Sequence, residues 1–259
     1  MKSTIKVFQV LETLCEGNAA GVTELSRQLD IKPSSMHRFL SVLRKMEYVD
    51  KDDISGRYFA TMKVSRLGTA VKSKTSLLAV ARPHMETLCE NVLEAVNIAV
   101  FTQNNVVVID RVQSAEMLRT NIVIGRHLPA YCTAFGKIFL AFMSSHTLGE
   151  YLSQVDLKPL SAHTITDNET LIAELEQIRR RGYAIDNREL DDNVRCIAAP
   201  IWDDNAELVA AISVSAPVNR FKMVRVKSIS KTLLNASATI SAKLGYYATE
   251  KKKTVRTGR

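Results

Sequence analysis

Two short helical patterns separated by a tight turn, within residues 22–46, constrain the fold of this chain more than any other segment. Residues 22–29 place their apolar side chains on one face, and a second amphipathic pattern begins at Pro33, which is tolerated in a first helical turn. Residues 30–32 have the length of a helix-turn-helix connection. A further amphipathic helix is predicted over residues 5–16. The side chains expected to face the core from the pattern that starts at Pro33 are Met36, Phe39, Leu40, Leu43 and Met46.

A polar β-hairpin follows these helices. Residues 48–51 and 57–60 have the residue types of short strands, and the polar segment between them contains Gly56. Three helices and a hairpin form a winged helix-turn-helix, whose recognition helix enters the major groove of DNA with its N-terminal residues on base edges. The plainer alternative is a small helical cluster with a solvated polar face.

The candidate DNA contacts lie on the polar face of the second helix of the pair and in the wing. Ser34 and His37 can reach bases or phosphates, and Arg38 supplies charge on the same face. Arg57 in the wing can reach a flanking phosphate. Arg44 is also explained as a basic residue that is favourable near a helix C-terminus. The predicted DNA-binding residues are Thr23, Ser34, Ser35, His37, Arg38, Arg44 and Arg57.

The charge of the chain is unevenly distributed. Residues 1–75 carry 13 Lys and Arg against 8 Asp and Glu, whereas residues 76–248 carry 17 against 18. The last eleven residues, 249–259, carry 5 against 1 and are expected to be a basic, disordered tail. A basic block that coincides with the predicted helix-turn-helix favours a double-stranded DNA partner, because Lys and Arg that neutralise phosphates release condensed counterions.

Several classes of protein are excluded by absent motifs. The ten glycines include no pair with the spacing of a phosphate-binding loop or of a dinucleotide-binding turn, and the chain has no G-x-S-x-G or H-E-x-x-H motif. No cofactor, metal site or catalytic residue is therefore predicted. The four cysteines are widely separated, which is typical of reduced thiols in a cytoplasmic protein. No apolar run is long enough to span a membrane, and the N-terminus lacks the features of a signal peptide.

The remainder of the chain alternates between helical and strand patterns without the repeated strand-helix-strand order of a parallel sheet. Strands around Asn104 and Asn105, and around residues 203–205, are expected to form antiparallel hairpins. The fold class is therefore α+β. Helices are predicted over residues 77–92, 133–143, 168–181 and 221–245, and strands over 95–102, 106–112, 117–124, 194–201 and 207–215.

These patterns divide the chain into four parts. Residues 1–61 form the winged helix-turn-helix and residues 62–75 a helical linker. Residues 76–248 form a near-neutral second domain, and residues 249–259 the tail.

The sequence resembles the IclR family of bacterial transcriptional regulators over roughly residues 4–247. In the DNA-binding part the resemblance runs through residues 34–40 (SSMHRFL), Tyr48, Val49, Tyr58, Leu67 and Gly68. The more specific motifs are residues 128–141 (LPAYCTAFGKIFLA), 178–186 (IRRRGYAID) with Glu189, 196–201 (CIAAPI) and 211–217 (AISVSAP).

The resemblance implies a C-terminal GAF-like domain that binds a small, often carboxylate-bearing effector. It also implies a homodimer, often paired into a dimer of dimers, on palindromic operators. The family's effector-binding positions fall on Ala130, Tyr131, Cys132, Thr133, Ala134, Asp186, Cys196, Ser213 and Ser215.

The chemistry of these positions suits an organic acid or a sugar acid. Backbone N–H groups at a helix N-terminus near Thr133 can accept a carboxylate, and Ser213 and Ser215 point to one face of a strand. Asp186 can accept a hydrogen bond from an effector hydroxyl. These residues also have purely structural explanations. Ser213 and Ser215 can be a half-buried polar pair, Cys196 a small core residue, and Asp186 the cap of a turn.

The sequence departs from the family at two places. Many members have Gly at the position of Glu47, so the turn into the wing is expected to differ. Asn187 and Arg188 replace a more acidic pair, and an Arg beside the pocket either favours an acidic effector or faces water.

Three functions are compatible with a DNA-binding unit joined to a second domain. The favoured one is a metabolite-responsive transcriptional regulator, most simply a repressor of a catabolic operon, with an activator of the same class as the alternative. An enzyme that uses Cys196 or Ser213 as nucleophile lacks a recognisable base partner. An architectural DNA-binding protein does not explain the large second domain.

Overall fold

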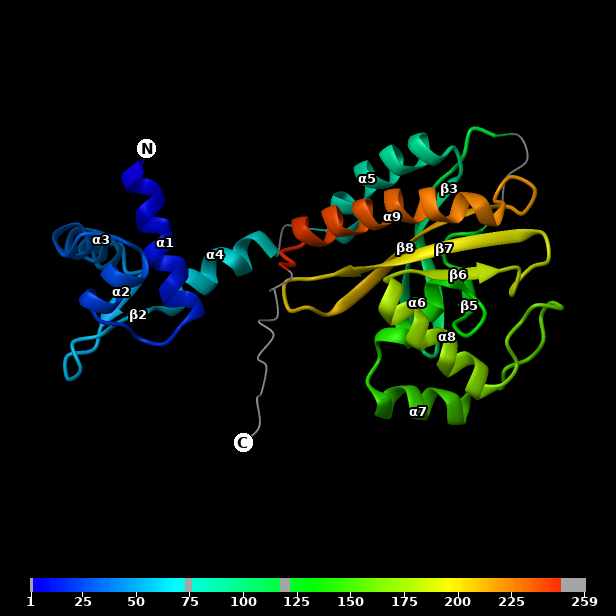
Figure 1. The fold of residues 1–259 in the computed structure, drawn as a ribbon, viewed down its shortest axis with the longest axis horizontal. Coiled ribbons are helices and arrows are strands. Elements are labelled where there is room, and N and C mark those ends of the chain that lie inside the picture. Colours follow the sequence, from blue (N-terminus) through cyan, green and yellow to red (C-terminus); the bar gives the residue numbers. More distant parts are fainter. Residues whose placement is uncertain (1, 73–75, 117–121, 248–259) are drawn as a thin grey trace. The chain divides into compact units, whose positions relative to one another are not determined.

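The computed structural model of the 259-residue chain describes residues 2–72, 76–116 and 122–247. The chain separates into two compact units, Met1–Ser76 and Leu77–Arg259, each with its own hydrophobic core (Figure 1).

The N-terminal unit is a winged helix-turn-helix, as the sequence predicts. A connection of four residues, 29–32, separates α2 from α3, and the strands of the wing pair antiparallel, with Val49 opposite Ala60. The elements in order are α1 (Lys2–Glu16), α2 (Val22–Gln28), α3 (Pro33–Lys45), β1 (Val49–Lys51), β2 (Tyr58–Ala60) and α4 (Met62–Lys72).

The core of this unit lies between α1, α2, α3 and the wing. Val10, Leu25, Met36 and Leu40 are fully buried there. The prediction that Met46 faces the core is wrong, because its side chain is 51% exposed. The helix ends one residue earlier, and Met46 is its C-cap, where the chain already turns away from the helical periodicity.

The C-terminal unit is built on one antiparallel sheet of six strands in the order β5-β4-β3-β8-β7-β6 (Figure 1). Every neighbouring pair is antiparallel, which confirms the predicted α+β class. The strands are β3 (Ala95–Thr102), β4 (Asn105–Val112), β5 (His127–Pro129), β6 (Ala184–Asn187), β7 (Val194–Trp202) and β8 (Leu208–Pro217).

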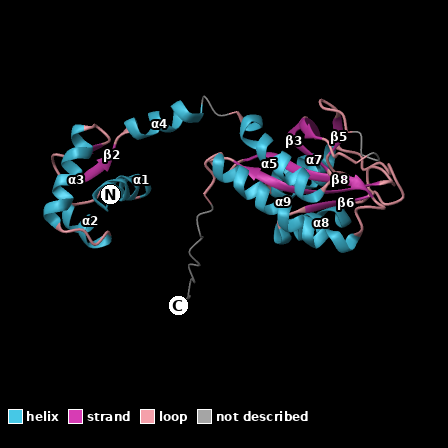
Figure 2. Cartoon of the chain, turned by 90° about the horizontal axis from the view of Figure 1, so that it is seen from above, coloured by secondary structure: helices cyan, strands magenta, loops and turns pink. Residues whose placement is uncertain are grey.

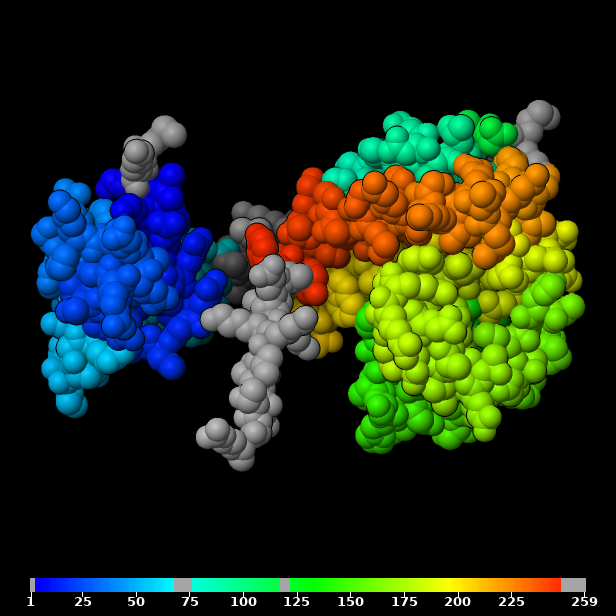
Figure 3. Space-filling view, in the orientation of Figure 1, coloured from blue at the N-terminus to red at the C-terminus, as the bar shows by residue number. Residues whose placement is uncertain are grey.

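Helices cover both faces of the sheet. On one face α5 (Leu77–Val92) and α9 (Met223–Lys243) pack side by side (Figure 2, Figure 3). On the other face α6 (Ala134–Phe142) packs against β7 and β8, and α8 (Asn168–Arg181) packs against α6. Successive side chains of each strand alternate between these two layers, as in Ile197 and Ala198 of β7.

Several predicted elements require correction. The first hairpin turns at Gln103 and Asn104, both with positive φ, and Asn105 already pairs in β4. Helix α7 (Ser145–Gln154) and strands β5 and β6 were not predicted. Of the strand expected over residues 117–124, residues 122–124 form no strand, and the others lie outside the described residues. The predicted basic tail, residues 249–259, also lies outside the described residues.

In the described part of the chain, no helix combines the length and the apolar character that crossing a membrane requires.

Candidate functional site

The face of α3 that points away from the core carries the predicted DNA-binding side chains. Ser34, His37 and Arg38 are exposed, and Ser35 is half-buried beside them. The apolar residues of α3 are buried on the opposite side, so packing of the helix fixes which face is offered to a partner. Thr23 is exposed in the first turn of α2.

Two predicted phosphate contacts are held in ion pairs within the unit. Arg44 Nε donates to Asp50 Oδ1 at 3.2 Å. Arg57 Nη2 donates to Glu24 Oε2 at 2.6 Å, and its Nε donates to the carbonyl of Ala19. Exposed ion pairs of this kind contribute roughly 0–1 kcal/mol, so DNA could displace them, but neither Arg is an uncommitted cation.

The turn into the wing has the backbone conformation that glycine adopts easily. Glu47 has a φ of 60°, and its carbonyl accepts a hydrogen bond from the Thr61 hydroxyl at 2.6 Å. Its carboxylate accepts from Lys63 Nζ at 3.0 Å. The departure at position 47 therefore keeps a left-handed turn and adds an ion pair to α4.

In the C-terminal unit the predicted effector residues of the sheet form one polar row. Asp186 of β6 lies opposite Cys196 of β7, and Cys196 lies opposite Ser215 of β8. Ser213, two residues earlier on β8, lies opposite Asn97 of β3. Alternation along each strand places all five side chains on the face that α6 covers.

Two polar atoms of this row are buried without a hydrogen-bond partner. Asn97 Nδ2 donates to Ser215 Oγ at 3.2 Å, but Asn97 Oδ1 and Ser213 Oγ have no partner. Both residues are fully buried. An unmade hydrogen bond in the interior costs about 1–3 kcal/mol, so neighbouring unpartnered groups indicate a place where a polar ligand binds.

A buried ion pair lies next to the row. Lys137, in the first turns of α6, is 1% exposed and its Nζ donates to Glu189 Oε1 at 2.5 Å. Glu189 Oε2 is buried without a partner, and the Glu189 backbone N–H donates to Asp186 Oδ1 at 2.7 Å. The pair therefore connects the start of α6 to the aspartate of the row.

The pKa values of the titratable groups in and beside the row are raised above their ordinary values. Burial, together with the negative charge of Glu189, raises the pKa of Asp186 to about 7, although Lys137 opposes the change. Burial and the charge of Asp186 raise the pKa of Cys132 to about 12 and also raise the pKa of Cys196. At neutral pH both thiols are protonated, and Asp186 can exist in either form.

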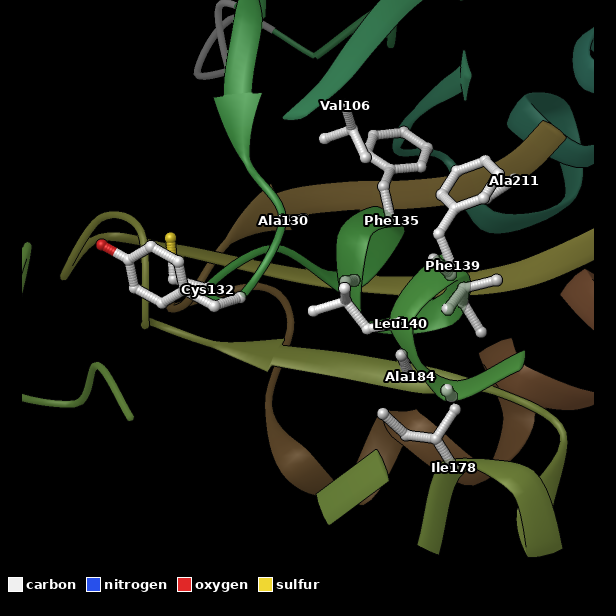
Figure 4. Close-up of a cluster of buried hydrophobic side chains, with 14 of the residues drawn as sticks. Val106, Ala130, Cys132, Phe135, Phe139, Leu140, Ile178, Ala184 and Ala211 are labelled. Carbon is white, nitrogen blue, oxygen red and sulfur yellow. The ribbon is translucent and has the colours of Figure 1, made fainter. Parts of the chain in front are cut away.

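The loop before α6 lies against the start of that helix, and Figure 4 labels Ala130 and Cys132 in it. Ala130, Tyr131 and Cys132 are buried, and the Tyr131 hydroxyl donates to the carbonyl of Lys158 at 2.8 Å. Thr133 is the N-cap of α6, and its hydroxyl accepts from the Gly136 N–H at 3.1 Å. The first N–H groups of α6, beginning at Ala134, have no intrahelical acceptor, which suits them to a carboxylate.

Gly136 is the reason why this loop can lie so close to the helix. A Cβ at Gly136 would meet the Ala130 backbone at 2.2 Å. In Figure 4 the same helix directs Phe135 and Phe139 towards Val106 and Ala211, which anchors it on the sheet.

Arg188, which departs from the family pattern, is engaged in its own loop. Its Nε donates to the carbonyl of Asp192 at 2.7 Å, and its φ is 72°. The neighbouring Asn187 is exposed, and its Oδ1 accepts from Arg195 Nε at 2.8 Å. Arg188 thus has a role within the loop between β6 and β7, and Asn187 links the two strands.

Sequence reasoning missed Asn97, Lys137 and Glu189 as members of the site. Asn97 is a single polar residue in an apolar strand, and that interruption was the available signal. Lys137 was part of a recognised motif, but a lysine within a helix gave no indication of its burial. Among the described residues, no group of three or more His, Cys, Asp or Glu side chains could hold a metal ion.

Comparison with protein families covers both units. Residues 69–242 match the description "Bacterial transcriptional regulator IclR C-terminal", and residues 3–53 match "IclR helix-turn-helix domain".

Curated relatives match nearly the whole chain. The HTH-type transcriptional regulator KdgR of Escherichia coli (strain K12) is 33% identical over 247 residues, which cover 95% of this chain and 94% of the relative. The DNA-binding transcriptional repressor YiaJ of the same organism is 32% identical over 232 residues, which cover 88% and 82%.

Solved structures show the same fold. The IclR of Thermotoga maritima is 30% identical, with a TM-score of 0.64 and coverage of 95% of this chain and 100% of that one. The repressor BlcR of Agobacterium tumefaciens, at 24% identity, has a TM-score of 0.83 and coverage of 96% and 99%.

Proposed function

The chain belongs to the IclR family of bacterial transcriptional regulators, and on that premise we propose that it is a repressor of a catabolic operon controlled by a small organic acid or sugar acid. The effector releases the protein from a palindromic operator or re-orients it there. The relative YiaJ is named a repressor, which supports this sign of regulation over activation. The regulator acts as a homodimer or a dimer of dimers in the cytoplasm.

One observation carries the proposal for the effector. Ser213 Oγ and Asn97 Oδ1 are buried and unpartnered beside Ser215, on the sheet face that α6 covers. We assign the effector carboxylate to the N–H groups at the start of α6 and its hydroxyl or keto oxygens to the row. A fixed arrangement of donors and acceptors recognises such a ligand without an Arg or Lys in direct contact.

The effector residues proposed are the loop of Ala130, Tyr131, Cys132, Thr133 and Ala134 together with Asp186, Cys196, Ser213 and Ser215. Since Ala130, Tyr131 and Cys132 are buried, the loop contributes through its backbone.

Ser213→Ala is the test of this site. Removal of the hydroxyl is expected to weaken the effector response about 2- to 10-fold, the loss typical of a hydrogen bond between neutral groups, while operator affinity is unchanged. The ligand-free variant should be no less stable than wild type, because an unpartnered buried hydroxyl is removed. The measurement is operator binding and thermal unfolding against a panel of 2-oxo, 2-hydroxy and sugar acids.

Ser230→Ala is the matched control. Ser230 is buried in α9, on the other side of the sheet, and its hydroxyl donates to the Lys227 carbonyl. It should respond to the effector as wild type does. If Ser213→Ala also responded normally, the effector site would lie elsewhere, and if no acid of the panel changed stability or operator affinity, the sensor proposal would be lost.

The chemistry of the second unit argues against the enzyme alternative. A nucleophilic cysteine needs its thiolate, and burial together with Asp186 raises the pKa of Cys196. Since its neighbours in the row are Asp186 and Ser215, Cys196 is suited to contact a ligand rather than to attack one.

A further inference from the structure

A groove on the N-terminal unit lies between α1, the end of α2 and the start of α3. Its volume is about 700 Å³, and it is lined in part by Lys6, Ser26, Arg27, Lys32 and Arg38. Three separate helical elements therefore supply its walls. Of the residues that line it, Ser35 and Arg38 belong to the set of DNA contacts predicted from the recognition helix.

The charge of the groove is strongly positive. Four cationic side chains face one acidic residue, Asp30. Among the described residues, Arg27, Lys32 and Arg38 take part in no ion pair, in contrast to Arg44 and Arg57, which are paired with Asp50 and Glu24. The cations of this unit that are free of ion pairs thus include three that line the groove, whereas Arg44 of α3 and Arg57 of the wing are paired.

The start of α3 adds a second source of positive potential. Its N-cap, Lys32, supplies no side-chain hydrogen bond to the helix, and Pro33 occupies the first turn. The N–H groups of Ser35 and Met36 already donate to the Lys32 carbonyl, so the helix N-terminus contributes mainly its partial positive charge, which favours an anion.

A buried hydroxyl points to a ligand independently of these charges. Ser26 is only 8% exposed, and its Oγ is buried without a hydrogen-bond partner while the residue lines the groove. A hydroxyl can donate to a phosphate oxygen, which would satisfy an atom that the protein itself leaves unpaired.

We propose that this groove binds a phosphodiester of the DNA backbone, held by Ser26, Arg27 and Lys32, with Lys6 contributing from α1. The inference rests on the DNA-binding role of the unit and extends the interface beyond the recognition helix. Since Arg38 lies both in the groove and on the exposed face of α3, a phosphate held here fixes the position of that helix along the duplex. The same chemistry would fit free inorganic phosphate, so the test must separate the two sources.

Arg27→Gln and Lys32→Gln in the full chain test the charge of the site. Each should weaken binding about tenfold, equally on a selected operator duplex and a shuffled duplex, because backbone contacts carry no sequence information. The slope of log affinity against log salt concentration should become shallower by about 0.9 for each phosphate contact that is lost. Lys231→Gln, an exposed residue of α9, removes the same charge from the other unit and should leave both quantities unchanged.

Ser26→Ala separates a phosphate contact from a merely structural role. Binding to both duplexes should weaken severalfold with an unchanged salt slope, because the hydroxyl is neutral, while the free protein loses no stability. If Arg27→Gln and Lys32→Gln behave as Lys231→Gln does, the groove is no part of the DNA interface and the proposal fails.

A titration with inorganic phosphate at constant ionic strength distinguishes the remaining source. A phosphate-dependent rise in melting temperature that Arg27→Gln abolishes, with DNA affinity unaffected, would assign the groove to a free anion and overturn the proposal. Failure of the wild-type chain to bind either duplex would instead contradict the function on which the inference rests.

Discussion

Glu47 holds a left-handed backbone conformation that costs a residue with a side chain roughly 1–2 kcal/mol. Glycine adopts the same conformation with little penalty. The Glu47–Lys63 ion pair offsets part of the cost, but its carboxylate is largely exposed and exposed pairs contribute little.

We therefore expect Glu47→Gly to raise the free energy of unfolding of the N-terminal unit by about 1 kcal/mol. Glu47→Ala is the control, because alanine loses the ion pair and keeps the strained backbone. Urea unfolding of both variants measures the difference. Equal stability of the two variants would show that the backbone of Glu47 stores no strain.

Asp186 should make the stability of the C-terminal unit depend on pH. Its pKa in the folded protein is raised to about 7, whereas an unfolded Asp ionises near 3.9. The folded state therefore binds the proton more tightly, and the stability present below about pH 4 is lost as pH rises through 7.

Asp186→Asn removes this titration while retaining an oxygen that can accept from the Glu189 N–H. The stability of wild type relative to Asp186→Asn should fall between pH 5 and pH 7, with a slope of up to about 1.4 kcal/mol per pH unit. Unfolding midpoints of both proteins at pH 5, 6, 7 and 8 provide the measurement. Parallel pH profiles would mean that Asp186 is already ionised at pH 5.

At the scale of elements, the position of α6 depends on the missing side chain of Gly136. A methyl group there would meet the Ala130 backbone at 2.2 Å, so the helix and the loop before it would have to separate. The N–H groups assigned to the effector carboxylate would move with them.

Gly136→Ala should destabilise the C-terminal unit by about 3 kcal/mol, the upper part of the usual range for overpacking, and abolish the effector response. Gly149→Ala is a matched control, because α7 has open space at that position and the substitution should stabilise the helix by about 0.5–1 kcal/mol. Thermal unfolding of both variants tests these two expectations. A Gly136→Ala variant as stable as wild type would show that the Ala130 backbone moves away without cost.

Elements with clear end signals or a long periodic pattern are predictable from the sequence, and short elements without them are not. Helix α8 begins and ends where the sequence predicts, because Asp167 caps it and Gly182 ends it in a left-handed conformation. Helix α7 was missed because its short, polar segment contains Gly149, and β6 because it has only four residues.

Site residues that lie in family motifs could be predicted from the sequence. Contacts between residues far apart in the sequence could not, because only the folded structure brings them together. Asn97 reaches Ser215 across 118 positions of sequence, and only strand pairing brings them together. Likewise, the sequence shows Arg57 in the wing, but not that Glu24 of α2 holds it.

For the whole molecule, separate cores predict separate unfolding. Met36 is buried in the core of the N-terminal unit, and Leu175 in that of the C-terminal unit. Calorimetry should resolve two transitions, of which duplex DNA raises one and the effector the other.

Met36→Ala and Leu175→Ala should each cost about 2–5 kcal/mol and lower a different transition. A single transition that both substitutions lower equally would show that the two units unfold as one.

The polar row also has a genetic consequence. A substitution at Ser213 leaves the helix-turn-helix intact. In the proposed oligomer, an assembly of variant and wild-type subunits therefore still occupies its operator, but its variant subunits do not respond to the effector. Such alleles should be dominant over wild type and prevent induction, whereas alleles that unfold the core around Met36 should be recessive and constitutive. A screen for uninducible mutants would therefore map the sensor, and a screen for constitutive mutants would recover changes in the DNA-binding unit.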